Sequence, residues 1–186
     1  MDWIDKVDIK KIMNVPLKEG DTFFKKELYR YVFKGKPKVT TIIELEYYAN
    51  KVVVISFYTD GTGNDKTRYK IRHNYPSVVV LRIYQACLKA FITLNENNDY
   101  ALVFNAADDI GDYKPFNKRM SSYVTFLENY YPNFSDECSY FGYMTLNTFY
   151  FHHKASPNID HAKAFFEQYC ERIKELLNEE EETNDK

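Results

Sequence analysis

The stretch TTIIELEYYANKVVVISFYTDG, residues 40–61, decides the fold that this sequence predicts. Its first half alternates, so that Ile43, Leu45 and Tyr47 would lie on one face of a strand and the residues between them on the other. The second half, VVVISFY, is apolar throughout, which is typical of a central strand. Residues 49–51 separate the two halves and predict a turn. The stretch therefore predicts an antiparallel hairpin within a β-sheet.

Similar patterns on both sides of this hairpin extend the sheet and add helices. The further predicted strands are residues 28–35, 67–74, 100–106 and a hairpin over 138–153, and the predicted helices are residues 77–94, 116–131 and 157–178. The Gly-rich DGTGND at 60–65 is not followed by the Gly-Lys-Ser/Thr of a phosphate loop, so it predicts a turn between strands. We therefore expect an α+β fold with a mainly antiparallel sheet of about five to seven strands, packed by three helices and carrying a short N-terminal helical arm.

The length of 186 residues predicts a single α+β domain over residues 1–178. Within it, residues 1–14 predict an amphipathic helical arm that carries Trp3, and residues 15–22 predict a linker because they contain Pro, Gly and Asp. Residues 179–186, EEEETNDK, predict a disordered acidic tail.

Composition favours a cytoplasmic protein without a membrane partner. No run approaches the roughly 18 apolar residues of a membrane helix, and the acidic N-terminus is unlike a secretory signal. Cys87, Cys138 and Cys170 are odd in number and widely spaced, which predicts neither a zinc ribbon nor disulfides. We expect Cys138 to be exposed, because it lies in the polar run SDECS.

Four segments carry a resemblance to known sequences: VVVISFYTDGTGND at 52–65, the helix from Val78, YALVFNAADD at 100–109 and KRMSSYVTFLENYY at 118–131. Together they resemble a group of small bacterial and phage proteins, over about residues 28–131. The resemblance implies an antiparallel meander, a Gly-containing turn, a long helix, an apolar strand and a second helix. That group has no established activity, so the resemblance implies a fold and no site.

The residues able to carry chemistry predict no catalytic site, no metal site and no cofactor. Asp108 and Asp109 follow a strand, and with His152, His153 or His161 they could ligate a cation in a metal-dependent hydrolase. Acidic residues before a helix more commonly cap it, and adjacent strand residues such as His152 and His153 point to opposite faces. The hydrolase is therefore the third hypothesis for function.

A nucleic-acid-binding surface is the second hypothesis. Basic side chains interleave with tyrosines on two predicted strands, and such rings can stack on bases. The pI near 6.1 and the net charge of −2 are low for such a protein. Lysines on an edge strand also serve to prevent association between sheets.

Our leading hypothesis is a non-enzymatic factor that binds another protein, such as an inhibitor, an immunity or anti-defence protein, or an accessory subunit of a bacterial or phage system. The 17 Tyr, 14 Phe and single Trp exceed what the predicted helices and hairpin need, and Tyr, Trp and Arg are enriched at interface hot spots. The expected contact residues are Trp3, Tyr29, Arg30, Tyr31, Tyr47, Tyr48, Arg68, Tyr69 and Arg72. Tyr113 and Tyr130 are candidates of second rank.

Overall fold

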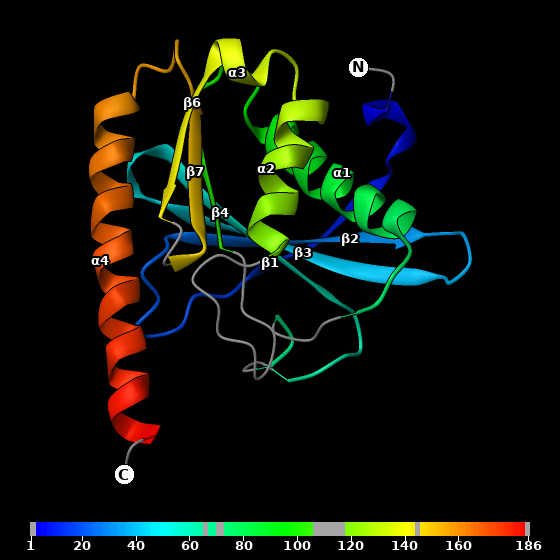
Figure 1. Ribbon diagram of the computed structural model, residues 1–186, viewed down its shortest axis with the longest axis horizontal. Helices are drawn as coiled ribbons and strands as arrows, with labels where there is room; N and C mark the ends of the chain where they lie inside the picture. The colour runs from blue at the N-terminus through cyan, green and yellow to red at the C-terminus, as the bar shows by residue number, and fades with distance from the viewer. Residues whose placement is uncertain (1–2, 65–66, 70–72, 106–117, 144–145, 185–186) are drawn as a thin grey trace.

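The computed structural model describes residues 3–64, 67–69, 73–105, 118–143 and 146–184. Its strands are β1 (Ile9–Val15), β2 (Lys25–Phe33), β3 (Val39–Tyr48), β4 (Val52–Thr59), β5 (Ala101–Asn105), β6 (Cys138–Tyr143) and β7 (Thr148–His153). The helices are α1 (Ser77–Leu94), α2 (Lys118–Tyr130), α3 (Phe134–Glu137) and α4 (Ile159–Asn184), with 3₁₀ turns η1 (Ile4–Lys6) and η2 (Ala49–Lys51). The strands form one sheet in the order β1-β2-β3-β4-β5-β7-β6 (Figure 1).

The predicted α+β class and the mainly antiparallel sheet are confirmed. Within the described residues every neighbouring pair of strands is antiparallel except β4 and β5, which α1 connects. The hairpin predicted from residues 40–61 is β3 and β4, with Tyr48 paired to Val52 around η2. Three long helices pack on the sheet, and α3 adds a single short turn.

Helices cover the sheet on both faces, and the alternation of the strands decides which residues meet them. Helices α1 and α2 lie on one face and α4 lies on the other (Figure 1). Ile43, Leu45 and Tyr47 belong to the core beneath α1, as their alternation predicted. On the opposite face, Tyr48 and Val54 pack with Phe166 of α4.

Most of the aromatic side chains fill these two cores. Phe91 of α1 meets Phe151 edge-to-face at 5.4 Å between ring centroids, and Phe134 meets Phe151 at 5.2 Å. On the α4 side, Tyr150 lies 5.1 Å from Phe166. Such pairs stabilise a fold beyond the area that they bury, so the aromatic surplus of this chain is largely accounted for by its interior.

The predicted N-terminal helical arm is wrong. Residues 4–6 form only a 3₁₀ turn, and residues 9–15 form the edge strand β1. The segment is also not detached from the domain: Val7 is buried, and the Lys89 ammonium of α1 donates hydrogen bonds to the carbonyl oxygens of Ile4 (2.8 Å) and Val7 (2.5 Å). Pairing with β2 and this clamp outweigh a weak helical periodicity.

Two further boundaries differ from those predicted. A strand is expected over residues 67–74, but residues 67–69 form a turn, residues 73 and 74 have no regular structure, and residues 70–72 lie outside the described part of the chain. The sheet contains β1 as a strand that the sequence did not predict. Helix α4 continues to Asn184, so the acidic tail expected from residue 179 is helical up to that residue.

Helix α1 is the one helix among the described residues that is long and apolar enough to cross a membrane, contrary to the expectation that no such run exists. Its composition is also that of a core helix, and Ile83, Ala86 and Phe91 pack in the core against the sheet. The length and composition of α1 are therefore weak evidence for a membrane.

We predict that Lys89→Met loosens the N-terminal segment from α1. The substitution keeps the length and apolar stem of the side chain but removes two charge-assisted hydrogen bonds, so the free energy of unfolding should fall by about 1–3 kcal/mol. Hydrogen exchange of the amides of residues 4–15 should become faster than in wild type, whereas exchange of the α4 amides should not change. Lys163→Met, at a half-buried lysine in α4, is the matched control and should leave residues 4–15 protected.

Candidate functional site

Strand β1 is an edge of the sheet, and no described strand pairs with its outer side. It pairs with β2 alone, and five of its seven residues are exposed. The register shifts between Lys11 and Met13, which leaves Ile12 as a β-bulge. An edge strand presents alternate backbone N–H and C=O groups to solvent, so β1 has the hydrogen-bonding capacity to accept another strand.

Apolar side chains gather at this edge. Ile12 is 47% exposed, Met13 46%, Leu17 52% and Phe24 60%. Val15 pairs with Lys26, so the chain leaves β1 and returns to β2 at the same end of the hairpin. Leu17 and Phe24 both lie in this connection. We call Ile12, Met13, Leu17 and Phe24 the β1 surface.

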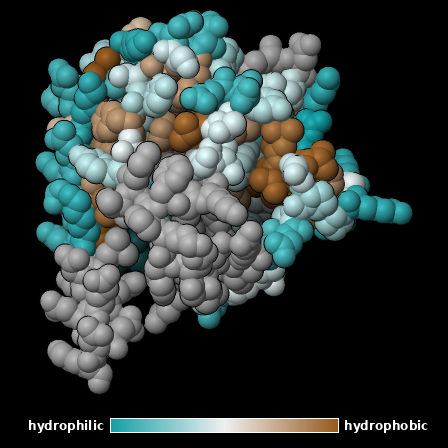
Figure 2. Space-filling model, viewed as in Figure 1, coloured by the Kyte–Doolittle hydropathy of each residue, from teal (hydrophilic) through white to brown (hydrophobic). Residues whose placement is uncertain are grey.

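A second apolar area lies at the start of α1. Figure 2 shows hydrophobic side chains gathered where Figure 1 places the beginning of this helix, and Val78 there is 52% exposed. Tyr140 and Tyr143 on the opposite edge strand are 39% and 38% exposed. These side chains are fewer, and lie farther apart along the chain, than the four side chains of the β1 surface.

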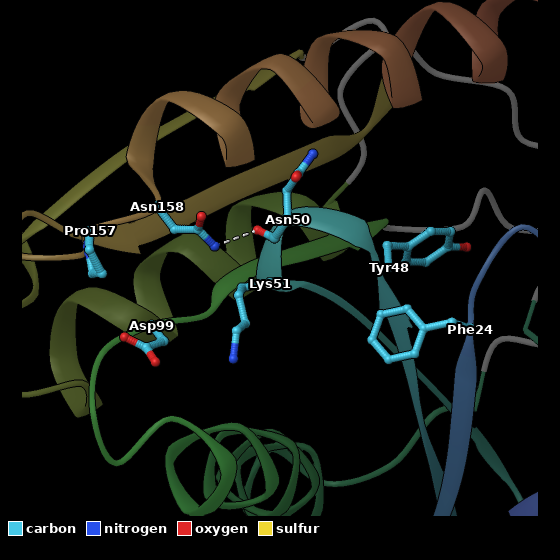
Figure 3. A pocket seen from close by; sticks show the side chains of 7 residues that line it. All are labelled: Phe24, Tyr48, Asn50, Lys51, Asp99, Pro157 and Asn158. Carbon is cyan, nitrogen blue, oxygen red and sulfur yellow. Dashed lines mark hydrogen bonds between the residues drawn. The ribbon is translucent and has the colours of Figure 1, made fainter.

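A shallow depression of about 460 Å³ adjoins the β1 surface through Phe24. Figure 3 shows Phe24 and Tyr48 at one end of it, Pro157 and Asn158 at the other, and Lys51 between them. The Asn158 side chain donates a hydrogen bond to the carbonyl oxygen of Asn50 (2.9 Å), which fastens the start of α4 to the turn between β3 and β4. The depression is open and its lining is both polar and apolar, so it is poorly suited to enclosing a small molecule. It serves instead as a continuation of the β1 surface.

Glu27 of β2 is the centre of a polar cluster beneath this edge. Its carboxylate is only 3% exposed, and it accepts hydrogen bonds from the hydroxyls of Tyr47 (2.6 Å) and Tyr29 (2.9 Å). It also forms ion pairs with Lys25 (2.9 Å) and with Lys11 of β1. The cluster therefore joins β1 to β2 and β3 through one buried charge.

The environment keeps this carboxylate ionised. Burial by itself would raise the pKa of Glu27, but the hydrogen bonds from Lys11, Tyr47, Lys25 and Tyr29 outweigh burial and lower the pKa to about 2. Burial and the bond to Glu27 raise the pKa of Tyr29 to about 12, so its hydroxyl stays protonated and donates. Perturbed pKa values can mark catalytic groups, but Glu27 and Tyr29 are each held by a partner within this cluster.

Glu44 forms a second buried cluster on the opposite face of the sheet. Its carboxylate lies 2.7 Å from the Lys26 ammonium and 3.2 Å from the Arg68 guanidinium, and it accepts a hydrogen bond of 2.5 Å from Tyr69. Burial lowers the pKa of Lys26, but the Glu44 and Glu46 carboxylates outweigh it and raise the pKa overall. This cluster fastens the segment after β4 onto the sheet.

These clusters decide where most of the predicted contact residues lie. The hydroxyls of four predicted rings donate to carboxylates inside the protein: Tyr29 and Tyr47 to Glu27, Tyr48 to Glu46 and Tyr69 to Glu44. Tyr31, Tyr47 and Tyr48 are buried, so the expectation that they are surface anchors is wrong. A strand pattern alone does not reveal that facing residues supply carboxylates for these hydroxyls.

The other predicted contact residues are placed as follows. Trp3 is half-buried and packs against the core, and Tyr130 stacks on Phe126 at 5.0 Å. Arg68 is held by Glu44, and Arg30 is exposed. Arg72 and Tyr113 lie outside the described residues. Of the predicted set, Arg30 is the residue that the structure places at the surface beside β1.

The helix that the sequence predicts over residues 1–14 does not indicate the exposed residues of β1. IKKIMNV contains Ile9, Ile12 and Val15, and β-branched residues favour strands, so the signal was present. Lys10 and the β1 surface are therefore additions that the structure makes to the candidate site.

The proposed alternative of a metal site gains no support from the described residues, which contain no group of three potential ligands. His152 is 1% exposed, and burial, Lys163 and His153 lower its pKa to about 4, so the imidazole is neutral. His153 faces the other way, 3.5 Å from Glu137. Asp108 and Asp109 lie outside the described residues. Cys138, expected to be exposed, is buried and close to Tyr131, because β6 pairs it with His153.

Comparison with known proteins found no matching family model, curated protein or solved structure.

We predict that Glu27→Gln destabilises the protein by about 2 kcal/mol at pH 7, because it leaves Lys11 and Lys25 without their buried counter-charge. The pKa of Glu27 is about 2 in the folded protein, against an ordinary value of 4.5. The ionised carboxylate therefore contributes stability that is complete above about pH 4.5 and is lost as the pH falls towards 2.

Denaturant unfolding of both proteins between pH 7 and pH 2 measures this difference. The gap between wild type and Glu27→Gln should be constant at neutral pH and should close in acid. Glu19→Gln, at an exposed loop position, is the control and should show no such gap. A gap that is independent of pH down to 2 would contradict the assignment of this stability to the ionised Glu27 carboxylate.

Proposed function

We propose that this protein is a small cytoplasmic, non-enzymatic factor that binds another protein through its N-terminal sheet edge. The observation that carries the proposal is the β1 surface: four large apolar side chains, each close to half exposed or more, along one hairpin whose outer strand pairs with no described strand on its free side. Apolar side chains at the centre of an interface, surrounded by polar ones, are the usual anchors of protein–protein contacts.

The surrounding structure suits a recognition role. The Glu27 cluster holds Lys11 of β1, and Lys89 holds the carbonyl oxygens of Ile4 and Val7 just before the strand, so both anchor this edge before any partner arrives. Preorganisation of this kind lowers the entropic cost of binding. An inhibitor, an immunity or anti-defence protein, or an accessory subunit of a bacterial or phage system is the biological setting that we propose for such a binding factor.

Nucleic-acid binding is the weaker alternative. It requires rings and cations on one accessible surface. Tyr29 and Tyr31 lie on the face of β2 that turns towards α1, whereas Arg30 lies on the other face, because successive strand residues point in opposite directions. Tyr69 is engaged by Glu44. These placements separate the expected stacking rings from the exposed cation.

The test is co-purification of the tagged protein from its native cells. We expect a stoichiometric protein partner with wild type, and we expect its loss with Met13→Asp, because a charge in the apolar centre of an interface should weaken binding by about 2 kcal/mol, or roughly 30-fold. Affinity is then measured by calorimetry with the purified partner. Thermal unfolding checks that Met13→Asp is folded, as expected for a residue 46% exposed.

Val78→Asp is the matched control, since Val78 is a similarly exposed apolar residue outside the β1 surface. It should retain the partner. If Val78→Asp loses the partner and Met13→Asp keeps it, the start of α1 is the docking surface and the proposal is wrong. Retention of the partner by both variants would also contradict it.

A further inference from the structure

Two exposed cations lie directly opposite each other beside the β1 surface. Lys10 of β1 pairs in register with Arg30 of β2, and both side chains are exposed. Like charges at directly opposed positions destabilise an antiparallel pair. Neither has an ion-pair partner among the residues that the structure describes, in contrast to Lys11, Lys25 and Lys26, which carboxylates of the sheet neutralise.

More cations lie at the same end of the hairpin. Lys34, Lys36 and Lys38 follow β2 in the turn to β3, and all three are exposed. The nearest acidic residue along β1 is Asp8, which is exposed and precedes Lys10. The balance of charge around Lys10 and Arg30 is therefore positive, so this end of the hairpin favours an anionic partner.

The next pair on the same face of the hairpin is apolar. Met13 pairs with Leu28, and Leu28 lies on the same face of β2 as Arg30 because two residues separate their positions. A segment lying along β1 would thus meet a cationic position and then an apolar one. Its backbone would face the outward N–H and C=O groups of the edge strand.

From these observations we infer that the partner of the β1 surface contributes an extended acidic segment, which adds to the sheet alongside β1 with carboxylates at Lys10 and Arg30 and an apolar side chain at Met13. The inference rests on the proposed function and names the chemistry of the partner. A second copy of this chain is a poor occupant, because edge-to-edge pairing would bring two sets of β1 lysines together.

The test uses synthetic seven-residue peptides, the length of β1, in which acidic residues alternate with valine. One comparison peptide has lysine for every acidic residue, and another keeps the acidic sequence but carries methyl groups on alternate backbone nitrogens, which removes strand pairing. A single-stranded oligonucleotide of equal charge is the fourth probe. Binding to the full chain is followed by fluorescence anisotropy and by hydrogen exchange.

We expect the acidic peptide to bind at least about tenfold more tightly than the lysine peptide and the N-methylated peptide, and to protect amides of residues 9–15. The double variant Lys10→Glu with Arg30→Glu should reverse the preference between acidic and lysine peptides. Arg172→Glu, at an exposed position of α4, is the control and should keep the wild-type preference.

Equal binding of acidic and lysine peptides would overturn the inference, as would protection outside residues 9–15. Tighter binding of the oligonucleotide, abolished by the double variant, would assign this edge to nucleic acid instead. If the peptide fails but Met13→Asp still loses the native partner, the inference is wrong and the proposed function stands. If the acidic peptide binds β1 but Met13→Asp retains the native partner, the proposed function is wrong.

Discussion

Coverage of the sheet by helices is the constraint on which the rest of this structure depends. Seven strands spaced by about 4.8 Å make a sheet about 29 Å wide, whereas a helix is about 10–12 Å across. One face has α1 and α2, but the other has α4 alone, packed over β4, β5 and β7. A single helix is too narrow for that face. The side of β1 and β2 that faces away from α1 is consequently left without a helix, and the exposed side chains of the hairpin follow from this shortfall.

Buried carboxylates lie on both faces of the sheet beside β1 and β2. Where apolar helix packing ends, the sheet surface is filled by polar side chains that satisfy one another, since a buried charge is tolerated only when it is paired and hydrogen-bonded. Glu27 forms ion pairs with Lys11 and Lys25 on one face. Glu44 forms ion pairs with Lys26 and Arg68 on the other. These clusters neutralise four cations, three from β1 and β2 and Arg68 from the segment after β4. They also engage tyrosine hydroxyls, so rings that resemble interface anchors in the sequence are internal parts of the fold.

The sequence predicts the parts of the fold whose pattern is local. Residues 40–61 alternate strongly, and their hairpin forms as predicted, as do the core helices and the hairpin of β6 and β7. The β1 segment also suits a helix, because Trp3, Ile4, Val7 and Ile12 recur near helical spacing, and only pairing with β2 and the Lys89 bonds decide between strand and helix. The site was harder to predict for the same reason. Arg30 was identified, but which lysine meets which carboxylate depends on the register of three strands, which no local pattern contains.

The register of β1 and β2 allows a choice between two explanations of the basic residues at this edge. Lysines on an edge strand guard against unwanted association between sheets, and the bulge at Ile12 contributes to such protection. That role accounts for Lys10, which lies on the edge strand itself. It does not account for Arg30, because β2 is an inner strand whose backbone is already paired on both sides. Placing Arg30 opposite Lys10 costs stability without protecting any free edge. A carboxylate bound between the two side chains would remove that cost, so the pair has a physical reason to exist if β1 receives an acidic segment.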